Sequence, residues 1–249
     1  MRTVLTFVAI VGCAIGCGFS ILAADEESEA AGEDSSAGLP EDYAKNYLVA
    51  AGTISPDKKV AFIYPTLEAD EAAENANHPE SVKNYIVALQ PFTVLGELPT
   101  KYPYFQHESN GGVSAEWSDD SSVALVTLDG KWGPHDVFLL EFHDGKLART
   151  TNLLAKAHDL LLPGYRKSKA EPYNDVFDFI FDAEDGPVFK LDGSNRVVIN
   201  GEATTDPKGL SEHRWSAQLK AVWDIAQAKF TSKKKVSGVT SQKSENSRD

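Results

Sequence analysis

Apolar and turn-forming positions alternate most clearly in the middle of the chain, between positions 111 and 147. Two apolar runs, at residues 123–128 and 137–142, are each short enough to form a strand, and the segment DGKWGPHD between them is rich in turn residues. A second turn, at residues 143–146, follows the second run. The pattern predicts consecutive antiparallel strands, as in a β-meander. Further apolar runs predict strands at 85–89, 92–95, 176–181, 187–191 and 197–202.

A turn that leads directly into an apolar strand occurs twice, in ISPDKKVAFIY from position 54 and in WSDDSSVALV from position 117. Aspartate favours such a turn because its side chain accepts a backbone N–H two residues further on. The two copies are 63 residues apart and align as Ser55 with Ser118, Asp57 with Asp120, Val60 with Val123, and Ala61 with Ala124. Residues 191–199 contain a weaker third copy.

The two copies read S-P-D-x-x-h-A-h and W-S-x-D-S-x-h-A-h, where h is apolar, and they resemble the blade signatures of TolB-like and WD-type β-propellers. The whole chain also resembles uncharacterised secreted bacterial proteins with propeller-like strands. The resemblance implies a propeller-like meander sheet. The copies are further apart than a blade period of about 40–50 residues, and a complete propeller needs at least about four blades. A closed four-bladed propeller is therefore the alternative.

Two stretches have helical spacing. Leucines and alanines between positions 153 and 161 predict a mid-chain helix that Asn152 or Thr151 caps and that Pro163 and Gly164 end. A C-terminal amphipathic helix that packs on the sheet is predicted from Trp215, Leu219, Val222, Trp223, Ala226 and Phe230. A membrane or partner contact is the alternative for this stripe. The predicted fold class is α+β, mainly antiparallel β, with both helices.

The first residues predict export. Arg2 is followed by an apolar segment at 4–24 and then by acidic residues, the pattern of a secretory signal peptide that is cleaved after position 24. A retained membrane anchor is one alternative, and a lipid anchor at Cys13 is another, because residues 10–13 resemble a lipoprotein processing box. Cys13 and Cys17, the two cysteines, both lie in this segment, so the folded body has no disulfide. We expect a periplasmic or extracellular location.

Composition divides the remaining chain into three parts. Residues 25–42 carry acidic but no basic side chains and predict a disordered spacer, residues 43–230 predict a single β-rich domain, and residues 231–249 predict a disordered polar tail. The formal net charge of −13 argues against binding to nucleic acid or to an anionic membrane, because phosphate contacts need clustered Lys and Arg. No membrane association is expected after signal cleavage.

The chain contains no motif that requires a cofactor, a metal or a particular reaction. Motifs of zinc proteases, serine hydrolases and phosphate-binding loops are absent from the sequence. His135 and His143 have the spacing to share one sheet face, but a zinc site needs three or four ligands. Turn roles are predicted for Asp119, Asp120, Asp129 and Asp144. No catalytic residue and no metal ligand is assigned.

Two groups of aromatic residues are candidates for ligand contact. Trp132 and His135 lie in the turn between two predicted strands, whereas Trp117 begins a strand and is expected in the core. A second aromatic loop contains Tyr102, Tyr104, Phe105 and His107. If both groups reach one rim, they form a patch suited to a sugar or a peptide. The sequence thus favours an exported, non-catalytic binding or interaction module with a protein, peptide or carbohydrate partner.

The alternative function is a secreted hydrolase whose carboxylates come from distant loops, for example Glu108 and Asp136. Catalytic carboxylates need to be neighbours only in space, so the sequence leaves this class of protein open.

Overall fold

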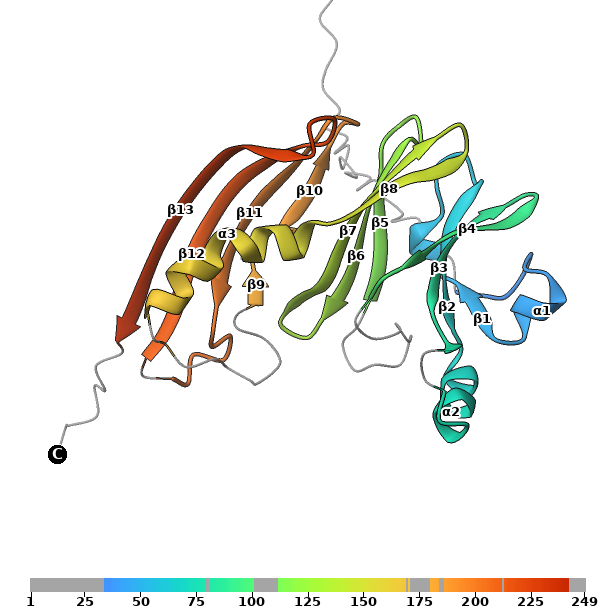
Figure 1. The fold of residues 1–249 in the computed structure, drawn as a ribbon, viewed down its shortest axis with the longest axis horizontal. Coiled ribbons are helices and arrows are strands. Elements are labelled where there is room, and N and C mark those ends of the chain that lie inside the picture. The colour runs from blue at the N-terminus through green and yellow to red at the C-terminus, as the bar shows by residue number, and fades with distance from the viewer. Residues whose placement is uncertain are drawn as a thin grey trace, which may run out of the picture. The chain divides into compact units, whose positions relative to one another are not determined.

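The computed structural model describes residues 34–78, 81–100, 112–168, 170, 180–183, 186–211 and 213–241, without the side chains of residues 213 and 237–241. These residues belong to one compact unit, Ala31–Asp249. They form three antiparallel sheets that follow one another along the chain (Figure 1). The prediction of a mainly antiparallel β protein is confirmed.

The first sheet contains β1 (Tyr47–Val49), β2 (Val60–Pro65), β3 (Asn84–Leu89) and β4 (Phe92–Leu98). The central sheet contains β5 (Gly112–Trp117), β6 (Val123–Gly130), β7 (Gly133–His143) and β8 (Lys146–Asn152). The third sheet contains β10 (Phe189–Asp192), β11 (Arg196–Thr204), β12 (His213–Asp224) and β13 (Lys229–Ser241), and β9 (Ile180–Asp182) also pairs with β11. The described helices are α1 (Glu41–Ala44), α2 (Leu67–Asn75), α3 (Leu153–Ser168) and a 3₁₀ turn at Ala51–Thr53. Each sheet contains a four-stranded meander, and β9 is a fifth strand of the third sheet.

The central sheet is buried on both faces. Along β6 and β7, alternate side chains enter a core shared with the third sheet and α3: Val123, Leu125, Val137 and Leu139. The intervening side chains enter a second core shared with the first sheet: Ala124, Val126, Phe138 and Leu140. Successive side chains of a strand point to opposite faces, so a strand buried on both faces needs a continuous apolar run. This explains the two runs that predicted these strands.

Polar contacts also join the sheets. Trp117 Nε1 donates to the Thr53 carbonyl at 3.0 Å and its ring stacks on Phe142 at 5.5 Å, so this residue, expected in the core, is partly buried and packs against the second core. On the other face, Arg149 forms a bidentate ion pair with Glu141 and its Nη2 donates to the Ile225 carbonyl at 2.5 Å. The central sheet is thus fixed to both neighbours.

The predicted C-terminal helix is wrong, because residues 213–224 form β12 and residues 229–241 form β13. Trp215, Leu219 and Trp223 are spaced by four residues, a spacing that places side chains on one face of a helix and also on one face of a strand. The two alanines between them distinguish a strand from a helix. Ala217 and Ala221 are also buried, so every second residue from 215 to 223 faces the core, which is the period of a strand.

The mid-chain helix is confirmed as α3, and Asn152 caps it by accepting a hydrogen bond from the Ala155 N–H at 2.8 Å. The helix does not end at Pro163, as predicted, but continues to Ser168. Beyond the proline, Tyr165 is buried and its ring meets Trp215 edge-to-face at 5.5 Å. Packing of this last turn against the third sheet therefore outweighs the helix-breaking effect of the proline.

The first copy of the repeated turn lies between β1 and β2. Ser55 Oγ donates to Asp57 Oδ1 at 2.7 Å and accepts from the Val60 N–H at 3.0 Å, and Lys58 has a φ of 57°. The buried hydroxyl thus holds the turn closed at the point where β2 begins.

The second copy lies at the equivalent place between β5 and β6. Ser118 Oγ donates to Asp120 Oδ1 at 2.7 Å and accepts from the Val123 N–H at 3.0 Å, and Ser121 has a φ of 56°. The alignment of the two copies is confirmed atom by atom. Residues 191–199 also lead into the second strand of their sheet, but there an ion pair between Asp192 and Arg196 at 2.6 Å spans the turn.

The turn predicted at Asp144 is confirmed between β7 and β8, where Asp144 and Gly145 have φ values of 49° and 70°. Asp129 instead lies within β6, and the turn residues are Lys131 and Trp132. The reason is the register of this hairpin, in which Asp129 and Gly130 still pair with β7.

At both ends, described residues outside the predicted domain 43–230 also take part in the fold. The polar residues 231–241 form part of β13, the edge strand that pairs with β12. An edge strand can carry Lys and Ser, because these side chains remain in contact with solvent. At the other end, Ser35 pairs with Val49, and Asp34 accepts a hydrogen bond from the buried Tyr64 hydroxyl at 2.7 Å, so part of the predicted spacer belongs to the fold. In the part of the chain that the structure describes, no helix has the length and apolar character to cross a membrane.

Trp223→Ala should lower the free energy of unfolding by about 3–5 kcal/mol, because it removes a buried indole from the core beneath the third sheet. Trp223→Phe should cost much less, since no described residue accepts a hydrogen bond from Trp223 Nε1. Deletion from Ser232 onward should also destabilise the protein, because it removes most of the strand that pairs with β12. Urea unfolding followed by circular dichroism measures all three, and an alanine variant as stable as the wild type would contradict the assignment.

The second turn should make stability depend on acid pH. Hydrogen bonds from Ser122 and Ser118 lower the pKa of Asp120 to about 2. This lies below the unfolded value of about 3.9, so the carboxylate stabilises the fold above pH ~4 and loses that contribution as the pH falls towards 2. Asp120→Asn should flatten the dependence of the urea midpoint on pH in this window. Asp119→Asn, one residue away and exposed, should leave it unchanged; equal slopes for the two variants would contradict this role.

Candidate functional site

A pocket of about 400 Å³ lies where two short strands share one edge of β11. β10 pairs with β11 as far as Ile199, and β9 begins to pair at Glu202. Between these two ladders, the Asn200 N–H donates to the Val188 carbonyl at 2.9 Å. The next residue, Gly201, is tightly enclosed. A Cβ at this position would lie 2.7 Å from the Val188 side chain and 2.9 Å from the Asp182 carbonyl oxygen. Residues at this interruption line the pocket, among them Asp182, Asn200 and Gly201.

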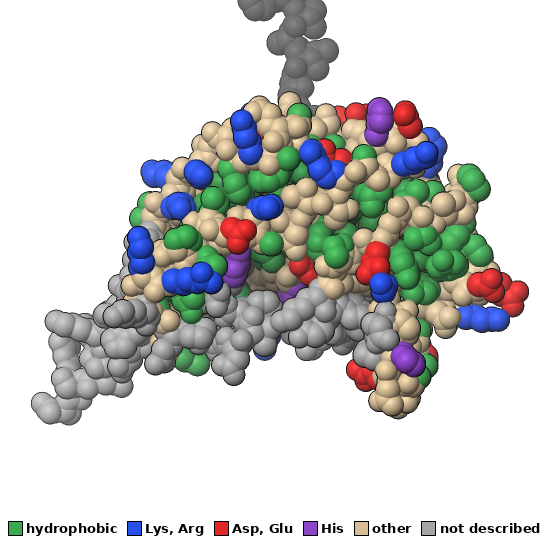
Figure 2. All heavy atoms as spheres, viewed as in Figure 1, with side chains coloured by type: hydrophobic (Ala, Val, Ile, Leu, Met, Phe, Trp, Pro, Cys, Tyr) green, Lys and Arg blue, Asp and Glu red, His purple; other side chains and the backbone are tan. Residues whose placement is uncertain are grey.

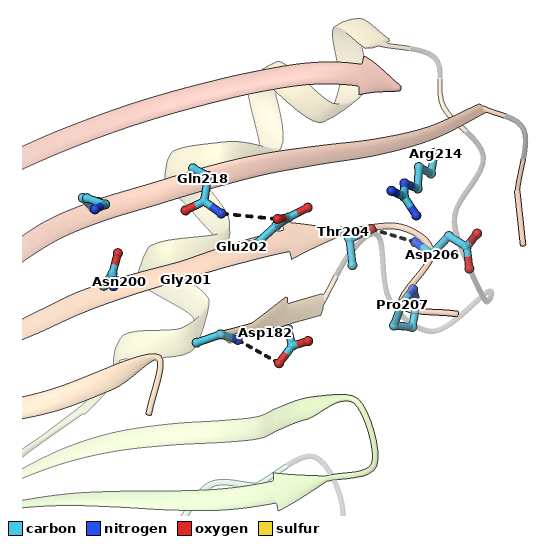
Figure 3. A pocket seen from close by; sticks show the side chains of 11 residues that line it. Asp182, Asn200, Gly201, Glu202, Thr204, Asp206, Pro207, Arg214 and Gln218 are labelled. Carbon is cyan, nitrogen blue, oxygen red and sulfur yellow. Dashed lines mark hydrogen bonds between the residues drawn. The ribbon is translucent and has the colours of Figure 1, made fainter. Parts of the chain in front are cut away.

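The floor of the pocket is the outer face of the third sheet. Asn200 and Glu202 of β11 lie opposite Lys220 and Gln218 of β12, and Gln218 Nε2 donates to Glu202 Oε2 at 3.3 Å. Figure 3 shows Asn200, Glu202 and Gln218 on the face of the sheet away from α3. The alternation that buries Leu219 on one face therefore places polar side chains on the other.

A loop ordered by one buried carboxylate closes one end of the pocket. Asp206 is 4% exposed, its Oδ1 accepts from the Lys208 N–H at 3.1 Å, and its Oδ2 accepts from the Ser211 N–H. Its own N–H donates to Thr204 Oγ1 at 3.1 Å. Such side chain-to-backbone bonds are typical of turns, so Asp206 shapes the loop.

Arg214 lies at the same end. A Cβ at Gly209 would lie 3.0 Å from Arg214 Nη1, and Gly209 has a φ of +68°, so a glycine both permits the turn and makes room for the guanidinium. Figure 3 shows Arg214 beyond Glu202 and near Asp206, whereas Asn200 and Asp182 lie towards the interrupted edge.

The pocket is lined by both basic and acidic side chains, and these described side chains do not form ion pairs with one another. Within the described residues, neither Arg214 nor Lys220 forms an ion pair, and the exposed Asp182 accepts a hydrogen bond only from the neighbouring Ala183 N–H, at 2.7 Å. A guanidinium can take a carboxylate through two parallel hydrogen bonds, and carboxylates can take an ammonium group. The arrangement therefore suits a ligand that carries charged groups of both signs.

The described lining residues include no histidine, cysteine, serine or aromatic side chain. Across the described part of the chain, no three histidine, cysteine, aspartate or glutamate side chains are grouped in a way that could hold a metal ion. The described lining offers charged groups, amides and one threonine.

Of the predicted ligand-binding residues, Trp132 and His135 lie in the described structure, on one hairpin. Trp132 is half-buried in the turn between β6 and β7, with Lys131 Nζ and Lys208 Nζ at 5.1 and 5.6 Å from its ring. His135 is exposed and covers Gly130, where a Cβ would lie 1.7 Å from its ring. Neither residue is among those that line the pocket.

The hairpin nevertheless borders the pocket. A Cβ at Gly133 would lie 1.8 Å from the Phe181 carbonyl oxygen, next to Asp182, and Lys208 follows Pro207 of the pocket loop. Trp132 therefore contacts the outside of the loop that Asp206 orders.

The remaining predicted contact residues, Tyr102, Tyr104, Phe105 and His107, lie outside the described residues, as does Glu108. Asp136, the other carboxylate of the hydrolase alternative, accepts a hydrogen bond from Asn152 Nδ2 at 3.1 Å and so orients the residue that caps α3.

Sequence reasoning missed the pocket, although the segment TTDPKG at 204–209 carries the turn signal Asp-Pro-x-Gly. The other lining residues gave no signal, because they come together only through the register of β9, β11 and β12.

Asp206→Ala should lower the free energy of unfolding by about 1–3 kcal/mol, because it leaves the partly buried backbone N–H groups of Lys208 and Ser211 without this acceptor. Asp206→Asn should cost less, since the amide oxygen still accepts one of the two bonds. Urea unfolding of both variants measures the difference. Curves that coincide with the wild type would show that Asp206 does not order the loop.

Comparison with other proteins adds no assignment to this pocket. No model of a known protein family matches the chain, and a search of curated proteins finds no match. The chemistry of the pocket therefore rests on the geometry described above.

Proposed function

We propose that the protein is an exported, non-catalytic binding module and that its ligand is a peptide held by charged groups in the pocket on the third sheet. The observation that carries this proposal is the presence of Arg214, Lys220, Asp182 and Glu202 around one pocket without ion pairs among them. Export rests on the predicted signal peptide at residues 1–24.

The size and charge of the pocket favour a peptide over other ligands. Its volume of about 400 Å³ is in the range of small-ligand sites, which suits two or three residues of a peptide. A peptide can offer a carboxylate to Arg214 and an ammonium group to Asp182. A sugar is less well supported, because the described lining has no aromatic side chain on which a sugar ring could stack.

The architecture is best explained as a propeller-like array of three blades related to the TolB-like and WD-type proteins. Two features support this relationship: each sheet contains a four-stranded meander, and two of the three carry the same Ser–Asp turn between their first and second strands. Such an array provides a rigid support, and function lies in what its outer faces carry.

Binding can be tested with residues 25–249 and a library of random hexapeptides, followed by calorimetry on the peptides that are retained. Arg214→Gln should weaken their binding at least about tenfold, because a hydrogen bond to a charged group contributes about 1.5–3 kcal/mol. Arg196→Gln is the matched control, since Arg196 is on the same sheet but pairs with Asp192. Its affinity should equal that of the wild type.

Three results would contradict the proposal: no peptide is retained, both arginine variants bind equally, or oligosaccharides are retained in place of peptides. Mass spectrometry of the bound peptides separates the two classes of function. Intact peptides support a binding module, whereas cleaved peptides support the hydrolase alternative.

A further inference from the structure

The loop that closes the pocket, residues 205–211, is held in shape from within. Asp206 accepts hydrogen bonds from the backbone N–H groups of Lys208 and Ser211, and the Gly209 N–H donates to the Asp206 carbonyl at 3.2 Å. These bonds join residues of the loop to one another. They set its shape, but its position relative to the central sheet depends on other contacts.

One such contact joins the loop to the hairpin of β6 and β7. Lys208 Nζ lies 5.6 Å from the centre of the Trp132 ring, and Lys131 Nζ of the hairpin lies 5.1 Å from it. An ammonium group at this distance is attracted to the negative face of an aromatic ring, and indole attracts it most strongly. The loop is therefore attached to the hairpin through Lys208.

Lysines and arginines are numerous around the third sheet. Figure 2 shows many of them over α3 and the neighbouring strands, on the side of the molecule where α3 lies. A lysine that only contacts solvent would need no explanation there. Lys208 is exposed, but its ammonium group lies over an aromatic ring of another sheet. Basic surroundings alone therefore do not account for this contact.

Trp132 lies on a hairpin whose position is fixed independently of the loop. Gly130 and Gly133 pair with each other across the turn. Gly133 has a φ of +138° and lies against β9, since a Cβ there would be 1.8 Å from the Phe181 carbonyl oxygen. Figure 1 shows this turn beside β9. The half-buried ring of Trp132 is therefore a fixed support for Lys208.

The loop in turn limits the space around Arg214. A Cβ at Gly209 would lie 3.0 Å from Arg214 Nη1, so the backbone of the loop adjoins the guanidinium group. A group that binds a ligand has to be held within about 0.5 Å of its productive position. A shift of the loop would therefore change where the guanidinium group can lie.

We propose that Trp132 is a positioning residue of the pocket: through Lys208 it holds the loop against the hairpin and so keeps Arg214 in place to bind the carboxylate of a ligand. This role rests on the proposed function of the pocket as a peptide site. It requires no contact between Trp132 and the ligand, and Trp132 is not among the described lining residues. A loop that is already in place lowers the ordering cost of binding.

Amide hydrogen exchange of residues 25–249, followed by NMR, tests whether Trp132 holds the loop. Trp132→Ala should speed exchange of the Lys208 and Ser211 N–H groups about 2–5-fold, which is the strength of a cation–π contact at an exposed site. Trp132→Phe keeps an aromatic face and should restore much of the protection.

The two lysines near the ring provide a matched pair of variants. Lys208→Gln removes the cation of the loop and keeps the backbone N–H that Asp206 accepts, so it should speed exchange as Trp132→Ala does. Lys131→Gln removes the cation of the hairpin and should leave exchange in the loop unchanged. Because Lys208 is exposed, Lys208→Gln also serves if Trp132→Ala fails to fold.

A double-mutant cycle tests whether the loop acts through Arg214. Hexapeptides that the wild type retains should bind Trp132→Ala about 2–5-fold more weakly. In the Arg214→Gln background, Trp132→Ala should cause no further loss, because the group that it positions is absent. A ring that contacts the ligand itself would instead weaken binding by the same factor in both backgrounds.

Equal exchange rates in Trp132→Ala and the wild type would overturn the proposal. So would equal effects of Lys131→Gln and Lys208→Gln on the loop, or equal losses of affinity in the two Arg214 backgrounds. If no peptide is retained, the proposed function fails, and the exchange rates alone then decide whether Trp132 holds the loop.

Discussion

Burial of the central sheet on both faces is the constraint on which the rest of the structure depends. β6 and β7 have no polar face, so a further layer must cover each side of them, and the two cores are filled by alternate residues of these strands, such as Val137 and Phe138. The first and third sheets therefore each bury one face against the central sheet, and their other face points outward. The polar contacts of Trp117 and Arg149 fix the neighbours, while the apolar alternation provides most of the driving force.

The first and third sheets, at the two ends of this stack, differ in the side chains of their outer faces. The third sheet ends the stack with a polar face, and the same alternation that buries Trp215 and Leu219 leaves Gln218 and Lys220 on the outside, where they line the pocket. The first sheet keeps apolar residues on its outer face. The outer faces of the first and third sheets therefore differ in chemistry, the one apolar and the other polar and charged.

The sequence predicts those parts of the fold whose signal is local. The continuous apolar runs of β6 and β7 and the Ser–Asp turns need only neighbouring residues, and they were recognised. The helix predicted over β12 was wrong because Trp215, Leu219 and Trp223 fit periods of both 3.6 and 2, and the deciding alanines carry little hydrophobic signal. The helix end predicted at Pro163 was wrong because contacts of Tyr165 lie far along the chain. The pocket depends on strand register, for which no local pattern exists.

The place of the pocket follows from the alternation of side chains along a strand. Its floor is the outer face of β11 and β12, and these side chains of the floor belong to neither core: Asn200, Glu202, Gln218 and Lys220. The residues that hold the sheet in the fold and the residues that line the pocket therefore alternate along the same two strands. Changes in the floor can alter the charge of the pocket without removing apolar side chains from the core, so ligand preference and stability are carried by different positions of one strand pair.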